Sequence, residues 1–180
     1  MTAIYLYDDA VARRFEPFAL TRPMSEVRIG ARLIRERWTH AVGLPVAGFV
    51  SSAHLADFEE PGASTAAAGT IPAGALLVNA RCAPQLAQAR RDLGQADVLE
   101  CDSRIAAVRL DSPLPAAELA DGPDVLERLA GARARASIAG WWIDDVWGVL
   151  ADLEQRLGTD LTQLVAGTPP VSPADRKSVV

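Results

Sequence analysis

Polar side chains with possible chemical roles stand directly after apolar runs of the sequence. Asp8 and Asp9 end the first of these runs, AIYLY at residues 3–7. Two adjacent carboxylates can hold Mg²⁺, which prefers oxygen ligands. An aspartate at the end of a strand can equally form an Asx turn with the backbone that follows it. Asp8 and Asp9 are therefore candidates either for a metal site or for turn chemistry.

Two arginines, Arg22 and Arg28, are the best candidates for contacts with an anion. A guanidinium group binds phosphate through two parallel hydrogen bonds. Ser25 is expected to cap a helix that places Arg28 in its first turn, where the helix N-terminus also favours anions. The alternative is a structural role, in which Arg22 pairs with a nearby carboxylate, namely that of Asp8, Asp9 or Glu26.

Asn79 and Arg81 follow a second apolar run, ALLVN at residues 75–79. Asn79 could hydrogen-bond a base or a ribose, and Arg81 could bind phosphate. The alternatives are turn chemistry for Asn79 and a solvated charge at the sheet edge for Arg81. Trp141 and Trp142 could stack on a nucleobase, or one of them could belong to the core.

Apolar runs and amphipathic stretches predict the elements that position these side chains. Runs at residues 3–7, 46–50 and 75–79 are expected to form buried strands. A helix is predicted to begin at Ser25 and to be stopped by Gly43 and Pro45, because apolar residues from Val27 to Trp38 recur at helical spacing. The other predicted elements are a helical turn at 54–60, a short helix at 84–93, a hairpin of strands 98–101 and 105–110, a helix at 124–136, and an amphipathic helix at 143–157 that Gly158 ends.

Strands that alternate with helices indicate an α/β fold with three layers and a mostly parallel sheet. Ligands of such sheets bind at the carboxyl ends of the strands, which is where Asp8-Asp9, Ser51-Ser52 and Asn79-Ala80-Arg81 are expected. Residues 1–167 are predicted to form one domain. Residues 168–180 are predicted to form a linker or tail, because their composition turns to proline and then to polar residues.

Composition excludes several classes of protein. The net charge of −5 disfavours general binding to nucleic acid or to anionic membranes. Since Lys177 is the only lysine, a phosphate-binding P-loop is not possible. Two cysteines and two histidines are too few and too scattered for a zinc site. The sequence has neither a recognisable signal peptide nor a membrane span, so we expect a cytoplasmic protein.

The segment Leu6–Trp38 resembles the opening of a family of sugar nucleotidyltransferases. Members begin with a strand, an acidic pair, a loop and the pattern T-R-P-x-x-E-[IVL]-R-x-G, followed by E-[KR]-W. The matching residues here are Thr21-Arg22-Pro23, Glu26, Val27, Arg28, Gly30 and Glu36-Arg37-Trp38. The run Ala75–Arg81 looks like the family's strand that ends in Asn-Ala-Arg, and Trp142–Leu161 is similar to its pre-terminal helix.

The resemblance implies a Rossmann-like nucleotidyltransferase fold and a reaction between a nucleoside triphosphate and a sugar 1-phosphate. It assigns Arg22 and Arg28 to catalysis, with Mg²⁺ as the cofactor held by Asp8 or Asp9. It also implies that Thr21, Asn79 and Arg81 bind substrate.

Members usually continue into a β-helix of hexapeptide repeats, so we expect a partial chain whose full-length protein is a homotrimer. The residues Asp175–Val180 hold the only lysine and are expected not to be native. The Gly-rich loop, the lysine and the metal-binding aspartate of active relatives are replaced here. The alternative is therefore a catalytically degenerate module that organises or regulates an attached hexapeptide-repeat acyltransferase.

Overall fold

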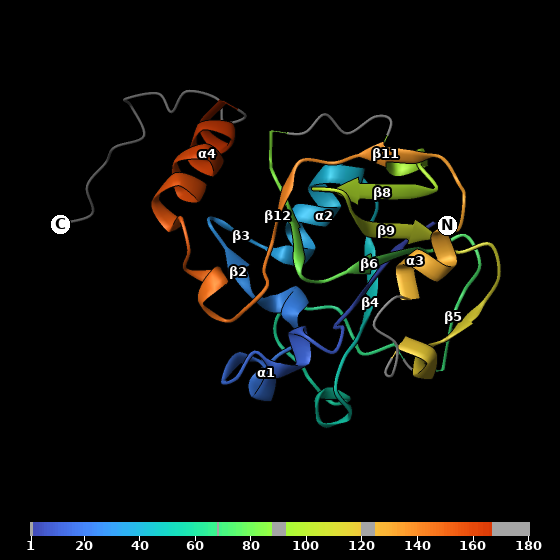
Figure 1. Cartoon of the computed structure of the whole chain (residues 1–180). Coiled ribbons are helices and arrows are strands. Elements are labelled where there is room, and N and C mark those ends of the chain that lie inside the picture. Colours follow the sequence, from blue (N-terminus) through green and yellow to red (C-terminus); the bar gives the residue numbers. More distant parts are fainter. Residues whose placement is uncertain (1, 68, 88–92, 120–124, 167–180) are drawn as a thin grey trace, which may run out of the picture.

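The computed structural model describes residues 2–67, 69–87, 93–119 and 125–166, which form a layered α/β structure around a six-stranded sheet (Figure 1). The strand order is β11-β8-β9-β6-β1-β4. Strand β1 runs parallel to β4 and β6, β8 runs parallel to β11, and β9 is antiparallel to both of its neighbours. The strands are β1 Ile4–Tyr7, β4 Val46–Val50, β6 Leu76–Asn79, β8 Val98–Cys101, β9 Arg104–Arg109 and β11 Arg135–Ser137.

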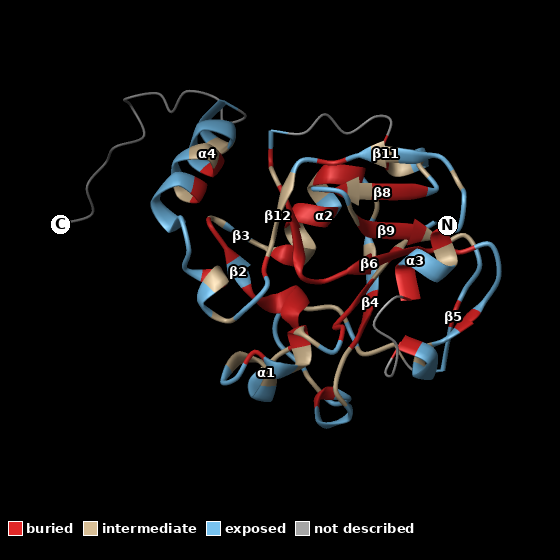
Figure 2. Cartoon of the chain, viewed as in Figure 1, coloured by how far each residue is buried: buried red, intermediate tan, exposed pale blue. Residues whose placement is uncertain are grey.

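Apolar side chains from both faces of the sheet form two separate cores, as the buried strands in Figure 2 indicate. In β6, Leu76 and Val78 belong to one core, and Leu77 between them belongs to the other. Helix α2 (Ile34–Val42) covers the first face and helix α3 (Val125–Ala130) the second. Two helical layers around a sheet with mostly parallel pairing confirm the predicted fold class.

Short elements complete the structure. Three two-stranded sheets are formed by β2 with β3, β5 with β10, and β7 with β12. Their bounds are β2 Arg28–Ile29, β3 Arg32–Leu33, β5 Thr70–Ile71, β7 Cys82–Pro84, β10 Leu114–Pro115 and β12 Gly140–Trp142. The remaining elements are helices α1 Phe18–Thr21 and α4 Leu153–Ala166, and 3₁₀ turns at 12–14, 24–26, 53–55, 93–95, 116–119 and 147–149.

The helix predicted between Ser25 and Gly43 was wrong in its first part, whereas its second part is confirmed by α2, which ends at Val42 with Gly43 as its C-cap. A 3₁₀ turn at 24–26 leads into the hairpin of β2 and β3, and α2 begins only at Ile34. Gly30 has φ +60°, a left-handed conformation that glycine adopts without strain and that forms the hairpin turn. Ile34 and Trp38 are still fully buried, so part of the same apolar stripe packs from a different backbone.

The helix predicted at 143–157 was also wrong. A short 3₁₀ turn stands at 147–149, Asp152 has φ +51°, and α4 then runs through Gly158 to Ala166. Two apolar residues of the predicted stripe remain exposed, since Trp147 and Leu150 retain 75% and 61% of their accessible surface. The helical pattern of apolar residues here therefore does not mark a buried face.

The other predicted elements have mixed outcomes. The hairpin around Asp102 and Ser103 is confirmed, with φ values of +49° and +62° at these two residues. The helix at 124–136 ends at Ala130, and the last residues of that range join β11 instead. Pro84 ends a strand rather than beginning a helix, and residues 88–92 lie outside the described residues, as do residues 167–180.

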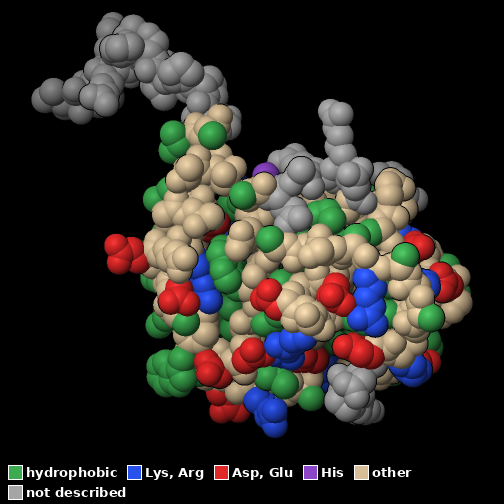
Figure 3. All heavy atoms as spheres, turned by 45° about the horizontal axis from the view of Figure 1, so that its top comes forward, with side chains coloured by type: hydrophobic (Ala, Val, Ile, Leu, Met, Phe, Trp, Pro, Cys, Tyr) green, Lys and Arg blue, Asp and Glu red, His purple; other side chains and the backbone are tan. Residues whose placement is uncertain are grey.

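The surface is mixed in charge, and the helices are short. On the face shown in Figure 3, acidic and basic side chains lie interspersed. None of the helices in the described part of the chain combines the length and apolarity needed to cross a bilayer.

Candidate functional site

The carboxyl ends of β1, β4 and β6 bring the predicted polar residues together. The parallel register pairs Tyr7 with Val50 on one side and with Asn79 on the other. The residues that follow these three, and Asn79 itself, therefore meet at one edge of the sheet. This edge holds Asp8, Asp9, Ser51, Asn79 and Arg81.

Asp9 is the centre of a dense hydrogen-bond network. Its carboxylate accepts bonds from Arg81 Nε at 2.9 Å and from Asn79 Nδ2 at 2.9 Å. It also accepts the backbone N–H groups of Val11 and Ala12, at 3.1 and 2.9 Å. Burial alone would raise the pKa of Asp9, but the hydrogen bonds from Arg81, Ala12 and Asn79 lower it. The Asx-turn alternative is thus present in the structure.

Arg81 is buried rather than solvated, with 6% of its surface exposed. In addition to Asp9, its guanidinium donates to Asp144 Oδ1 at 2.7 Å and to the carbonyl oxygen of Ile143 at 3.3 Å. Asn79 Oδ1 accepts the backbone N–H of Arg81 at 2.9 Å, and this bond fixes the turn between β6 and β7. The alternative of a solvated edge charge was therefore wrong.

A small polar pocket of about 220 Å³ lies beside Arg81. Arg104 contributes a second guanidinium, which lies 3.9 Å from the centroid of the Trp142 ring and bonds Asp144 at 2.9 Å. Burial and the charge of Asp9 raise the pKa of Tyr7, so the phenol stays neutral. The pocket is lined by Tyr7, Asp9, Asn79, Arg81, Arg104, Ile105, Leu126, Glu127 and Trp142.

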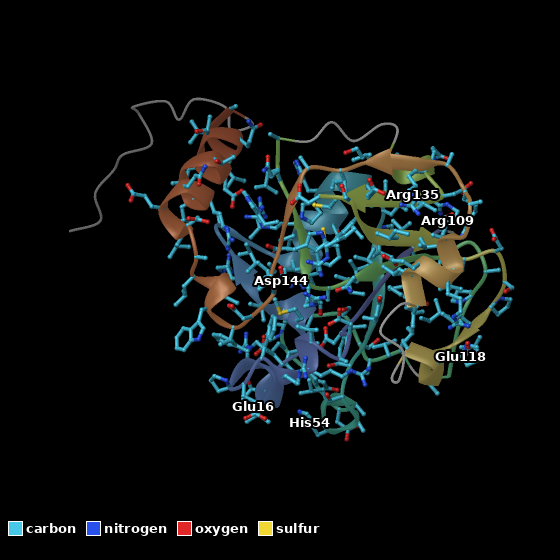
Figure 4. All side chains as sticks on the ribbon, in the orientation of Figure 1. Glu16, His54, Arg109, Glu118, Arg135 and Asp144 are labelled. Carbon is cyan, nitrogen blue, oxygen red and sulfur yellow. The ribbon has the colours of Figure 1, made fainter. Side chains whose placement is uncertain are left out.

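Sequence reasoning missed Arg104 and Glu127 and misread Asp144. Asp144 was expected to open a helix, but it pairs with Arg81 and Arg104 instead and follows β12 (Figure 4). The sequence feature that could have identified Arg104 as a site residue is its position directly after the turn of the predicted hairpin. Both neighbouring tryptophans pack against guanidinium groups. The centroid of the Trp141 ring lies 5.1 Å from the guanidinium carbon of Arg37 and 5.4 Å from that of Arg156, and Trp142 packs against Arg81 and Arg104.

Asp8 lies on the other side of β1 and is buried with local partners. Its carboxylate accepts the Ser51 hydroxyl at 2.5 Å and the Met24 backbone N–H at 3.1 Å. Burial raises the pKa of Asp8 to about 6, although the hydrogen bonds from Ser51 and Met24 oppose that rise. Ionisation of Asp8 therefore costs more free energy in the folded protein than in the unfolded chain.

We expect Asp8→Asn to change how stability depends on pH. Because the folded pKa of Asp8 lies above its unfolded value, its contribution to stability is complete below the unfolded pKa and is lost as pH rises through about 6. The asparagine does not ionise, so the stability of the variant relative to wild type should rise by about 2 kcal/mol from pH 4 to pH 8. Urea unfolding of both proteins across this range measures it, and a constant difference would contradict it.

The two aspartates do not fit a Mg²⁺ site. The oxygens of Asp8 and Asp9 already accept hydrogen bonds from their neighbours, and Arg81 places a positive charge against Asp9. Across the described residues, no group of three or more acidic, histidine or cysteine side chains is arranged to hold a metal ion. We therefore derive no step through Mg²⁺ at these residues.

A larger pocket of about 620 Å³ contains Thr21, Arg22 and Arg28. Arg22 pairs with Glu60 at 2.9 Å, a partner that the sequence did not suggest. Arg28 lies on β2, so its expected place in the first turn of a helix was wrong. The pocket is lined by Pro17, Phe18, Thr21, Arg22, Glu26, Val27, Arg28, Leu33, Glu60 and Val149.

Hydrogen bonds hold the polar side chains of this pocket in place. The Arg28 guanidinium donates to the Ala31 carbonyl at 2.6 Å, and the Thr21 hydroxyl donates to the Phe18 carbonyl at 3.2 Å. Glu26 is buried and pairs with Arg35 at 2.8 Å, while its other oxygen has no hydrogen-bond partner among the residues that the structure describes. Sequence reasoning gave Glu26 only as a pairing partner and did not find Glu60.

The predicted site residues thus separate into two groups. Thr21, Arg22 and Arg28 line the larger pocket, whereas Asp9, Asn79 and Arg81 line the smaller one. Asp8 joins the two regions, because it follows β1 and accepts the Met24 N–H near the larger pocket.

Comparison with known proteins identifies the family of the chain. No curated protein and no solved structure matches the chain. A family model described as sugar nucleotidyl transferase matches residues 4–168, which is nearly the whole chain. This match includes both pockets and confirms the resemblance seen at residues 6–38. The chain therefore belongs to the sugar nucleotidyl transferase family.

Proposed function

We propose that this chain binds a nucleoside triphosphate and a sugar 1-phosphate and joins them into a nucleotide sugar. One observation carries the proposal: Thr21, Arg22 and Arg28 line a single pocket of about 620 Å³, and the loop that carries Arg22 is joined to the carboxyl end of β1 by the Met24 N–H, which donates to Asp8. Open α/β sheets bind their ligands at this edge. Two guanidinium groups in one pocket suit phosphate.

The proposed reaction is an in-line displacement at phosphorus. A phosphate oxygen of the sugar 1-phosphate attacks the α-phosphorus of the triphosphate. A new P–O bond forms as the bond to the β-phosphate breaks, and pyrophosphate leaves with the electron pair. Arg22 and Arg28 would stabilise the negative charge on the phosphate oxygens and hold them in line.

Arg22 is suited to such a role because its present partner is replaceable. The Arg22–Glu60 ion pair is partly exposed, with 37% and 40% of the two side chains accessible, and such pairs contribute little to stability. A phosphate group could displace Glu60 and accept two hydrogen bonds from the Arg22 guanidinium. Asn79 and Arg81 are proposed to bind the substrate on the side of the smaller pocket. A hydrogen bond from the Arg81 backbone N–H to Asn79 Oδ1 already fixes their relative position.

Calorimetric titration of the chain with UTP, dTTP, GTP, CTP and ATP in Mg²⁺ buffer tests this proposal. We expect selective binding that Arg22→Ala weakens about tenfold or more, because charge-assisted hydrogen bonds contribute roughly 1.5–3 kcal/mol. Arg128→Ala is the matched control, since Arg128 also pairs with a glutamate, Glu118, but lies outside both pockets. Unchanged binding by a folded Arg22→Ala variant would contradict the proposal, whereas selective binding would justify a pyrophosphate-release assay.

A second candidate function is a non-catalytic module that organises or regulates an attached hexapeptide-repeat acyltransferase in a homotrimer. The observation that favours it is the saturation of Asp8 and Asp9 by hydrogen bonds at the edge where active relatives bind metal. This candidate predicts that no nucleoside triphosphate binds. It also predicts that Arg22→Ala leaves the acyl transfer of the full-length protein unchanged.

A further inference from the structure

Oxygen atoms of three residues from two segments converge on the guanidinium group of Arg81. Both carboxylate oxygens of Asp9 lie within 2.9 Å of its nitrogens, and Asp144 Oδ1 lies at 2.7 Å. The carbonyl oxygen of Ile143 completes the set at 3.3 Å. Carboxylate and carbonyl oxygens in such a group are the ligands that divalent cations prefer. Here they surround a guanidinium instead.

Both carboxylates that contact Arg81 are paired with guanidinium groups. Asp9 and Asp144 contribute two negative charges, and Arg81 and Arg104 contribute two positive ones. Each of the two carboxylates has a pKa below its usual range, so both are ionised at neutral pH. A metal ion placed here would be repelled by both guanidinium groups.

We infer that the Arg81 guanidinium takes the place of a divalent cation between Asp9 and Asp144 at the carboxyl end of the sheet. A role of this positive charge in catalysis rests on the proposed function. The positive charge at this edge is then part of the protein and does not depend on metal supply. Arg81 is fixed on two sides by carboxylates, so this charge is held without reorganisation.

Removal of the guanidinium should uncover a cation site. In Arg81→Gln, Asp9 loses its cation, Asp144 retains only Arg104, and the side-chain volume at position 81 largely remains. We expect this variant to bind one Mn²⁺ about tenfold or more tightly than the wild-type chain does. Electron paramagnetic resonance of free Mn²⁺ during a titration measures this binding. The titration contains no nucleotide, so its result is independent of whether the larger pocket binds one.

Two further variants identify the site. Arg81→Lys keeps a positive charge in the same position and should bind Mn²⁺ as weakly as wild type. The double variant Asp9→Asn with Arg81→Gln removes one ligand and should lose the affinity gained in Arg81→Gln. Circular dichroism checks that each variant is folded.

The inference is overturned if a folded Arg81→Gln variant binds Mn²⁺ no better than wild type. It is also overturned if the wild-type chain binds Mn²⁺ tightly and Asp9→Asn abolishes that binding. Should Arg81→Gln fail to fold, the comparison of wild type with Asp9→Asn decides the question. Equally weak Mn²⁺ binding by these two proteins supports the inference.

Discussion

Asp160→Ala is expected to lower the free energy of unfolding by about 3–5 kcal/mol, because it leaves a buried charge without a partner. Asp160 on α4 forms an ion pair with Arg37 on α2, and both side chains are fully buried. Asp160 also accepts the backbone N–H of Ala31 at 2.9 Å. Its loss would leave the Arg37 guanidinium with carbonyl acceptors, those of Ile29 and Pro84, but without its paired carboxylate. Urea unfolding followed by circular dichroism measures the change.

Two controls separate the buried charge from general damage to α4. Glu154→Ala removes a carboxylate from an exposed position of the same helix and should change stability by less than about 0.5 kcal/mol. The double variant Arg37→Met with Asp160→Leu removes both charges and should recover much of the stability. A double variant as unstable as Asp160→Ala would show that the carboxylate acts through its other contacts.

The same ion pair also holds the turn that follows Arg28. Arg37 Nε donates to the Ile29 carbonyl at 2.9 Å, and the Arg28 guanidinium donates to the Ala31 carbonyl of the same turn. The position of Arg28 in the larger pocket therefore depends on a contact between α2 and α4. Asp160, which lies near the end of the described chain, therefore helps to position Arg28 in the larger pocket.

Gly30→Ala is expected to destabilise the protein by about 2–4 kcal/mol. Gly30 has φ +60°, a conformation that costs an alanine about 1 kcal/mol or more. An added Cβ would also overlap Asp160 Oδ2 and lie 2.8 Å from Arg37 Nη2. Crowding of this kind in a packed interior costs about 1–3 kcal/mol. Urea unfolding followed by circular dichroism measures the sum of the backbone cost and the crowding cost.

Two other glycines provide matched controls for Gly30. Gly43 ends α2 with φ +71°, but an added Cβ would meet nothing within 4 Å, so Gly43→Ala should show only the backbone cost of about 1 kcal/mol. Gly158 lies inside α4 with open space around it, and Gly158→Ala should stabilise the helix by about 0.5–1 kcal/mol. Equal losses for Gly30→Ala and Gly43→Ala would show that the ion pair tolerates the added methyl group.

The sequence alone was sufficient for the elements that depend on local patterns. The apolar runs at 3–7, 46–50 and 75–79 became three neighbouring strands, most of whose residues are buried on the two faces of the sheet. The polar residues after two of these runs were correctly expected at one edge, since parallel strands end together. The motif around Arg22 and Arg28 was sufficient for the family.

The sequence misplaced the elements whose apolar pattern is compatible with two backbones. Ile34 and Trp38 are buried whether the preceding residues form a helix or a hairpin, so their spacing does not decide between the two. The left-handed turn at Gly30 decides it, and that turn is stabilised by Arg37 and Asp160. Local periodicity contains no information about such partners.

Only the tertiary structure decided which charges meet. Arg81 pairs with Asp9 and Asp144, which are 72 and 63 residues away in sequence, and Arg37 pairs with Asp160 across 123 residues. The energy of an ion pair depends on distance and burial, and the topology of the sheet and of α4 sets both. The sequence therefore determined which residue types were available for phosphate chemistry, whereas the fold determined that Arg81 is enclosed by carboxylates and that Arg22 and Arg28 share a pocket.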